Sequence, residues 1–267
     1  MKKTIRYPFY ITAFQSAFDF KWDKTFSFAG ERHGFWEIVA VCGGKVEITE
    51  DEKIYVLSAG DMICHAPLEF HRIRSYGDTE PHVLVISFEH EGALPEKLAD
   101  GPFTLSADEL SRYTHLFKKL HEWFNGETDS GQDLGAAVGY SLSDFILSLC
   151  SAHTPSKAVN VSGRAREYQQ IVKIMQSAVY DNLSLSDIAR RATVSVSTVK
   201  SLFFTFLGIS PIKYYSLIQI DEAKRLLSDG LSVNEVSEKM NFSSPNYFCS
   251  FFRRMVGCTP SKYKKTE

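Results

Sequence analysis

The sequence predicts an α+β protein with an N-terminal β-barrel, a helical hairpin, and then an all-α domain that contains two helix-turn-helix motifs. Three observations lead to this fold class. Short apolar segments alternate with turn residues over positions 37–88, and the next two segments carry apolar residues at spacings of three and four. The pattern Gly-x-Ser/Thr-Pro-x-Lys-Tyr then occurs at 208–214 and again at 257–263. A period of this length indicates a repeated supersecondary unit.

Five short strands are predicted in the N-terminal part, at 37–41, 45–49, 53–57, 62–65 and 82–88. Between the first two strands, Cys42, Gly43 and Gly44 are typical of a hairpin turn. Short strands at this spacing indicate a sandwich or a barrel, and a barrel offers a cavity for a ligand.

Two amphipathic helices follow, and the polar segment 125–133 between them predicts an antiparallel hairpin. Their main apolar stripes are Leu110, Tyr113, Phe117, Leu120 and Phe124, then Leu134, Val138, Leu142, Phe145 and Leu149. One face can pack on the barrel. Further apolar residues form either more of the same core or a dimer interface, and these are Tyr113, Leu116, Trp123 and Ile146.

Small, polar residues at 151–163 are typical of a flexible linker, which separates predicted domains at 1–150 and 164–267. The net charge of −2 hides an asymmetry. Residues 1–159 contain 15 Lys and Arg against 23 Asp and Glu, whereas residues 160–267 contain 15 against 9. A basic half joined to an acidic half indicates a polyanion-binding module attached to a domain of another kind.

The cysteines and the N-terminus bear on the compartment. Five cysteines without paired spacing argue against a disulfide framework, which favours an intracellular protein. Lys2 and Lys3 are followed by no apolar signal-peptide core, and no run approaches the length that crosses a membrane. We therefore expect a cytoplasmic protein with no membrane contact.

Each half of the repeat has the signals of a helix-turn-helix motif. Ser184 and Ser232 are suitable N-caps, with Asp187 and Glu235 three residues on, as in a capping box. Serine-rich turns at 195–197 and 243–244 precede second helices, and a helix over 211–228 separates the two motifs. The polar faces of the second helices suit base edges and phosphates in the major groove. The candidate DNA-binding residues are Ser197, Lys200, Ser201, Asn246, Cys249, Ser250, Arg253 and Arg254.

Residues 241–254 and 257–263 are similar to the signature of the AraC family of transcription regulators, and the resemblance covers about 165–265. Asn241 stands where the family usually has Gly, and Ser201 and Ser250 where it often has an Arg that reaches DNA. The resemblance implies a non-enzymatic regulator that binds double-stranded DNA and a small-molecule effector. It also implies a homodimer and, for an activator, contact with RNA polymerase.

Gly60, Asp61, Pro67 and His71 resemble the second cupin motif as it occurs in sugar-sensing members of this family, over about 5–95. The resemblance makes the barrel cupin-like. It also places Glu31, His33, Glu37 and His71 at the positions of cupin metal ligands, which suit Zn, Ni, Mn or Fe(II). The same side chains could instead bind a polar ligand, or be structural. His65 is left out, because a two-residue period from it does not reach His71 across Pro67.

The candidate ligand-binding residues are His33, Phe35, Trp36, Glu37 and His71. Phe35 and Trp36 would suit stacking on a sugar ring, although strand aromatics often belong to the core. The predicted function is a sequence-specific, effector-responsive transcription regulator without a cofactor, with a sugar among the candidate effectors. Two alternatives stay open: a metal-dependent cupin enzyme fused to a DNA-binding domain, and a constitutive DNA-binding protein that takes no ligand.

Overall fold

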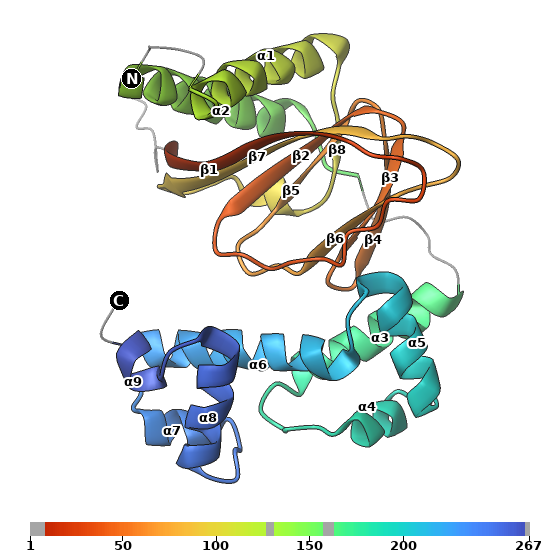
Figure 1. The fold of residues 1–267 in the computed structure, drawn as a ribbon, viewed down its shortest axis with the longest axis vertical. Coiled ribbons are helices and arrows are strands. Elements are labelled where there is room, and N and C mark those ends of the chain that lie inside the picture. Colours follow the sequence, from red (N-terminus) through yellow and green to blue (C-terminus); the bar gives the residue numbers. More distant parts are fainter. Residues whose placement is uncertain (1–8, 127–130, 157–162, 265–267) are drawn as a thin grey trace, which may run out of the picture. The chain divides into compact units, whose positions relative to one another are not determined.

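The computed structural model of the chain describes residues 9–126, 131–156 and 163–264 (Figure 1). It divides into two compact units, Met1–Asn160 and Val161–Glu267. The first contains two antiparallel sheets and a helical hairpin, and the second is all-helical. The predicted fold class is therefore confirmed.

Unit 1 contains a five-stranded and a three-stranded sheet. The larger consists, in spatial order, of β1 (Tyr10–Lys21), β7 (His82–Glu91), β2 (Trp36–Gly43), β5 (Asp61–His65) and β8 (Phe103–Thr104). The smaller consists of β4 (Lys53–Ser58), β3 (Lys45–Glu50) and β6 (His71–Ser75). Buried Val39, Val85, Val46 and Ile48, from both sheets, form one apolar cluster. All five predicted strands are present, and β1, β6 and β8 are additional.

The predicted hairpin at residues 42–44 is wrong. β2 pairs with β5 and β7 in the larger sheet, whereas β3 pairs with β4 and β6 in the smaller one. Gly44, with φ of +65°, lies where the chain passes between the sheets, and a Cβ there would be 2.8 Å from the Glu80 carbonyl oxygen. The glycines therefore form a tight corner between the two sheets. The hairpin prediction failed because a turn signal does not specify which strands pair.

The two predicted helices are α1 (Ala107–Phe124) and α2 (Gly131–Ala152), and both contact β1. A capping box between Ser106 and Glu109 begins α1. Of the residues considered for a dimer interface, Tyr113, Leu116 and Ile146 are buried in the core between helices and sheet, and Trp123 packs against the same core. Those residues are therefore intramolecular core. The exposed large apolar side chains on the two helices are Phe124, Tyr140 and Leu147.

The segment after α2 stays attached to unit 1. The Ser156 N–H donates to the Pro102 carbonyl oxygen at 2.7 Å, and Nε2 of His153 lies 2.8 Å from Oε1 of Glu109. Residues 151–156 thus belong to unit 1 and not to a free linker, while 157–162 lie outside the described residues. By length and composition, Asp133–Ala152 could span a membrane, contrary to the sequence expectation, but its apolar side packs on α1 and β1.

Unit 2 contains two helix-turn-helix motifs. The first consists of α4 (Leu185–Arg191) and α5 (Val196–Leu207), with α3 (Gly163–Ser177) packed against both. The second consists of α7 (Val233–Lys239) and α8 (Pro245–Val256), and α6 (Pro211–Ser228) joins the motifs as predicted. Both predicted capping boxes are present, at Ser184 and Ser232. The first turn is shorter than predicted, because Ser195 already caps α5.

The repeated Gly-x-Ser/Thr-Pro pattern has a common structural role. Gly208 and Gly257 end α5 and α8 in the left-handed conformation, with φ of +70° and +85°, which glycine adopts without steric cost. Ser210 and Thr259 then cap α6 and the short α9 (Pro260–Tyr263), each with proline in the first turn. The pattern therefore ends one helix and begins the next.

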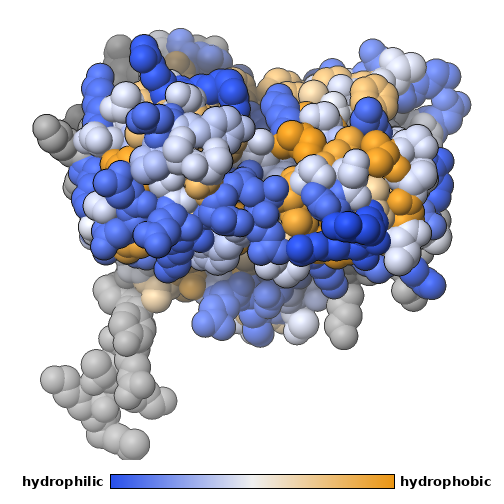
Figure 2. All heavy atoms as spheres, turned by 90° about the horizontal axis from the view of Figure 1, so that it is seen from below, coloured by the Kyte–Doolittle hydropathy of each residue, from blue (hydrophilic) through white to orange (hydrophobic). Residues whose placement is uncertain are grey.

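Surface polarity differs between the halves of unit 2. On the face shown in Figure 2, hydrophilic side chains dominate the half that holds α7 and α8, on the left. Hydrophobic residues are visible among hydrophilic ones on the half that holds α4 and α5. The exposed apolar side chains of α5 and α6 include Phe204 and Ile212.

Candidate DNA-binding helices and effector cavity

The second helix of each motif buries one face and exposes the other. In α5, Val199, Leu202 and Phe203 are fully buried. In α8, Phe248 and Phe252 are equally buried. The opposite faces carry the predicted DNA-binding side chains, of which Cys249 is half-buried and the others are exposed: Ser197, Lys200, Ser201, Asn246, Ser250, Arg253 and Arg254. The structure therefore leaves these groups accessible to a partner.

Two residues beside these faces were not among the predicted set. Arg164, at the start of α3, is exposed and donates a hydrogen bond from Nη2 to the Ser201 hydroxyl at 2.9 Å. No local pattern could have indicated this, because the two residues are 37 positions apart. Tyr247 follows Asn246 and is 53% exposed, so its place in the first turn of α8 was a usable signal. The Arg254 guanidinium lies 5.8 Å above the Phe251 ring.

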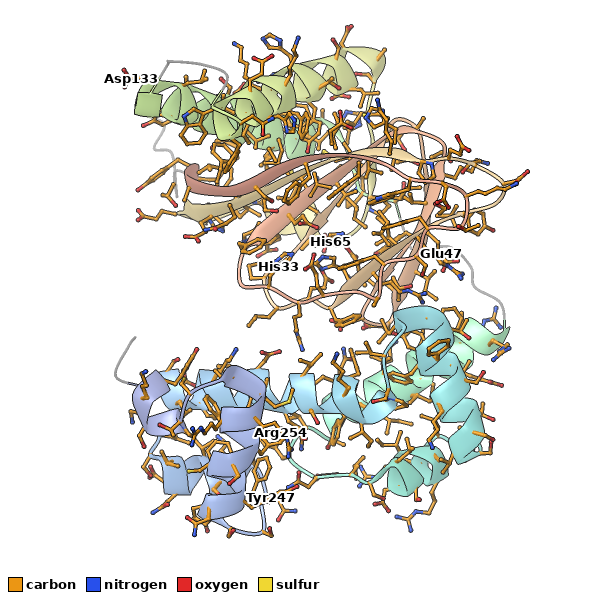
Figure 3. All side chains as sticks on the ribbon, viewed as in Figure 1. His33, Glu47, His65, Asp133, Tyr247 and Arg254 are labelled. Atoms are coloured by element: carbon orange, nitrogen blue, oxygen red, sulfur yellow. The ribbon has the colours of Figure 1, made fainter. Side chains whose placement is uncertain are left out.

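Unit 1 contains a cavity of about 370 Å³ within the barrel. Its aromatic wall comes from β1 and the segment after it, and its polar end comes from residues on four different parts of the chain. Figure 3 labels His33 and His65 at this end. The aromatic residues are Phe18, Phe20, Trp22, Phe26 and Phe28, and the polar ones are Glu31, Glu37, His65 and His71.

Backbone carbonyls orient two of the histidines. Nδ1 of His33 is 2.9 Å from the Phe35 carbonyl oxygen, and Nδ1 of His71 is 3.2 Å from that of Glu69. Because a carbonyl oxygen only accepts, each Nδ1 carries a proton. The Nε2 atoms of both histidines then face Glu37. Nε2 of His33 is 3.8 Å from Oε2 of Glu37, and Nε2 of His71 is 3.4 Å from Oε1. Neither Nε2 makes a hydrogen bond of good geometry with any described residue.

The carboxylate of Glu37 carries the charge of this group. Burial alone would raise its pKa, but the interactions with the nearby His71, His65 and His33 side chains outweigh burial and lower it. For His71, burial lowers the pKa, and interaction with Glu37 more than compensates, so the net shift is upward. Burial, with the neighbouring His71, lowers the pKa of His33. Glu37 is therefore ionised at neutral pH and His33 is neutral.

A second layer lies deeper and was missed at the sequence level. The His65 ring stacks on His71 with centroids 4.1 Å apart, and its Nδ1 is 2.7 Å from Oε1 of buried Glu50. Burial lowers the pKa of His65 well below its usual range and raises the pKa of Glu50 to about 8. The pKa of Glu69 is also raised to about 8, mainly by burial. The Glu50–His65 contact is thus a hydrogen bond between neutral groups at pH 7. The Pro67 turn brings His65 and His71 together, contrary to the argument that excluded His65.

The two predicted aromatic ligand contacts lie elsewhere. Trp36 belongs to the core between the larger sheet and the helices, on the opposite face of β2 from Glu37. Successive side chains of a strand point to opposite faces, so Trp36 and Glu37 cannot both enter the barrel. Phe35 stacks on the His33 ring, with centroids 3.9 Å apart, and does not line the cavity.

The four residues predicted as possible metal ligands do come together. Glu31, His33, Glu37 and His71 each offer a ligand atom within 4.8 Å of the others. Two imidazoles and two carboxylates suit Zn, Ni, Mn or Fe(II), and a carbonyl partner on Nδ1 is the usual second contact of a metal-binding histidine. Glu50, His65 and Glu69 form a second such group. The donor set is therefore chemically competent for a cation.

Comparison with known families matches both units. A model described as the AraC-like ligand binding domain matches residues 21–137, and a helix-turn-helix domain model matches residues 188–266. The chain belongs to the AraC family. The matched regions of this AraC-family chain include most of the cavity lining, apart from Phe18 and Phe20, and both α5 and α8.

Several individual proteins resemble this AraC-family chain. The virulence regulon transcriptional activator VirF of Yersinia enterocolitica is 35% identical over 103 residues, which cover 38% of each protein. The transcriptional activator NphR of Rhodococcus is 24% identical over 238 residues, or 85% of this chain and 69% of NphR. Crystallised ToxT from Vibrio cholerae is 14% identical over 94% of this chain and 97% of that one, with a TM-score of 0.36.

Proposed function

We propose that this AraC-family protein is a cytoplasmic, sequence-specific DNA-binding transcription regulator that responds to a small molecule bound in the barrel. The observation that carries the proposal is the pair of helix-turn-helix motifs joined by the single helix α6, each with an exposed polar face on its second helix. The matched relatives VirF and NphR are named as transcriptional activators, which supports a non-enzymatic role.

In this proposal α5 and α8 enter successive major grooves and expose short donors and acceptors to base edges. Asn246 is the strongest candidate reader, since an asparagine amide can bond N6 and N7 of adenine together. Lys200, Arg253 and Arg254 suit phosphate contacts. Arg164, which donates a hydrogen bond to the Ser201 hydroxyl, adds a guanidinium beside this face of α5.

The effector would act by binding one arrangement of the protein more tightly than another. A ligand can shift the equilibrium between two arrangements only by the difference in its affinity for them. A homodimer would bring a second pair of DNA-binding helices. When one subunit is bound to DNA, the effective concentration of the other subunit at an adjacent half-site would be raised. If the protein is an activator, RNA polymerase is a further partner. A constitutive DNA-binding protein would instead show the same DNA affinity with and without every cavity ligand.

Asn246→Ala should reduce affinity for the preferred DNA site by about 1 to 3 kcal/mol and relax selectivity at one base pair, because a bidentate base contact is lost. The preferred site can be selected from a random library and used in a fluorescence-anisotropy titration. Asn234→Ala, which removes an exposed amide from α7, is the matched control. Unchanged affinity and selectivity in Asn246→Ala would show that this face of α8 does not meet bases.

Arg254→Ala should weaken binding to all sequences alike and lower the salt dependence of affinity by about one unit of slope, because one phosphate contact is removed. The measurement is the slope of log affinity against log salt for specific and scrambled duplexes. Arg112→Ala removes the same charge from α1 of unit 1 and should leave the slope unchanged. A sequence-dependent loss in Arg254→Ala would instead place this arginine on a base.

A further inference from the structure

The polar end of the barrel cavity presents hydrogen-bond acceptors. Glu31 and Glu37 contribute carboxylates. His33 is next to this end but not part of the cavity lining: its Nδ1–H donates to the Phe35 carbonyl oxygen, and its Nε2 lies 3.8 Å from Oε2 of Glu37. Nε2 of His71 lies 3.4 Å from Oε1 of Glu37, so a proton on this atom would lie next to that carboxylate. Such an end complements a ligand that donates hydrogen bonds.

The charges at this end sum to a negative value in either protonation state of His71. Glu31 and Glu37 contribute two negative charges, and a protonated His71 cancels one of them. None of the described residues that line the cavity is Lys or Arg. A carboxylate or phosphate ligand would therefore meet uncompensated negative charge.

Most of the remaining wall is aromatic, and four of its rings contact one another in sequence. Phe20 stacks on Trp22 with centroids 5.3 Å apart, Trp22 stacks on Phe26 at 4.0 Å, and Phe18 lies 5.3 Å from Phe20. Val39, Ile73 and Val85 complete the lining. Aromatic faces attract cations within about 6 Å, and the rings also bury an apolar body.

We propose that this cavity binds an organic cation, an ammonium or related nitrogen cation on a compact aromatic or aliphatic body. The cationic head would lie against Glu37 and Glu31, with its N–H groups toward the two carboxylates, and the body would lie along the aromatic wall. This inference rests on the proposed function, because it names the effector class of the same cavity. A bare metal ion accounts for the acceptors but not for a cavity of about 370 Å³ with an apolar wall.

The test compares three probes that share one body and differ in head charge: phenethylamine, 2-phenylethanol and phenylacetate. Binding to the full chain is measured by calorimetry at pH 7. We expect phenethylamine to bind at least about tenfold more tightly than the alcohol, and phenylacetate to bind most weakly, since a charged hydrogen bond contributes about one to two orders of magnitude. Equal or undetectable binding of all three by the folded protein would overturn the inference.

Glu37→Gln should reduce phenethylamine affinity about 10- to 100-fold and erase the preference over the alcohol, because it keeps the shape and removes the charge. Glu31→Gln, at an exposed position, is a second variant with little effect on folding. Glu89→Gln, exposed on β7 outside the cavity lining, is the matched control and should bind like the wild type. Retained preference for the amine in both cavity variants would contradict the assignment.

Two further measurements separate the alternatives. Stoichiometric Zn²⁺ binding that disappears in His33→Ala and His71→Ala, without any head-group preference among the probes, would replace the organic cation by a metal site. DNA affinity is measured on the same samples. Amine binding that leaves DNA affinity unchanged supports the cavity assignment and counts only against the effector role, whereas absence of DNA binding counts against the proposed function alone.

Discussion

Phe117→Glu should unfold the barrel unit and not merely separate a dimer. Phe117 is 4% exposed and belongs to the core between α1, α2 and the larger sheet. The substitution removes a buried ring, which by itself costs about 3 to 5 kcal/mol, and adds a carboxylate without a partner. For a unit of this size, 1 kcal/mol corresponds to roughly 2 to 4 °C, so thermal melting of unit 1 should fall by more than about 10 °C.

Tyr140→Glu is the matched variant, because Tyr140 lies on α2 with 69% of its side chain exposed. Its melting temperature should stay close to that of the wild type, and sedimentation then tests whether the outer face of α2 is shared between copies. A Phe117→Glu protein whose unit 1 melts within a few degrees of the wild type would contradict the packing described for α1. A wild-type chain that stays monomeric at high micromolar concentration would contradict the proposed dimer.

Raising the pH from 7 to 8.5 should destabilise the wild type more than Glu50→Gln. Burial raises the pKa of Glu50 to about 8 in the folded state, whereas the unfolded carboxyl ionises near 4.5. The folded state therefore retains a proton that the unfolded state has lost. Protonated Glu50 therefore makes its full contribution to the free energy of unfolding below pH 4.5. Between pH 4.5 and 8 this contribution falls by about 1.4 kcal/mol per pH unit, and above pH 8 it is lost.

Histidines whose pKa values are lowered do not contribute to the pH dependence above pH 7, because they are neutral in both the folded and the unfolded state there. Glu69 and His71 also have raised pKa values, but both are present in the wild type and in Glu50→Gln, so the wild type should lose the additional stability that Glu50 contributes. Denaturant unfolding at several pH values gives the slopes. Glu96→Gln, at an exposed site, should follow the wild type. Parallel slopes in Glu50→Gln and the wild type would show that Glu50 is ionised when folded.

Much of unit 2 could be derived from the sequence because its signals are local. A serine three residues before an acid begins a helix through its own backbone contacts, as at Ser184 and Ser232. A glycine that ends a helix and a proline that begins the next act over four residues, which is why the repeat located the helix ends around Gly208 and Gly257. The apolar spacing of three and four in α5 and α8 then determined which faces are exposed.

The pairing of strands and the contents of the cavity depended on the tertiary structure. Cys42 to Gly44 indicate a turn in the sequence, but only the packed sheets decide that β2 and β3 separate there. Trp36 and Glu37 are adjacent in the sequence but point to opposite faces of β2. Trp36 therefore packs in the core, and Glu37 lines the cavity. Contacts across the barrel, such as that of Glu50 with His65, produce no periodic pattern in the sequence and could not be predicted from it.

The sequence by itself determined the family, the fold class and the polar faces of the recognition helices, because caps, periodicity and the repeat are encoded within a few residues of one another. Only the tertiary structure decided that Phe117 and Tyr113 are core, that Arg164 reaches Ser201, and that the cavity joins an aromatic wall to an acceptor-rich end. These features arise from residues far apart in the chain. Burial and charge at such sites are properties of the whole packed unit and not of any local segment.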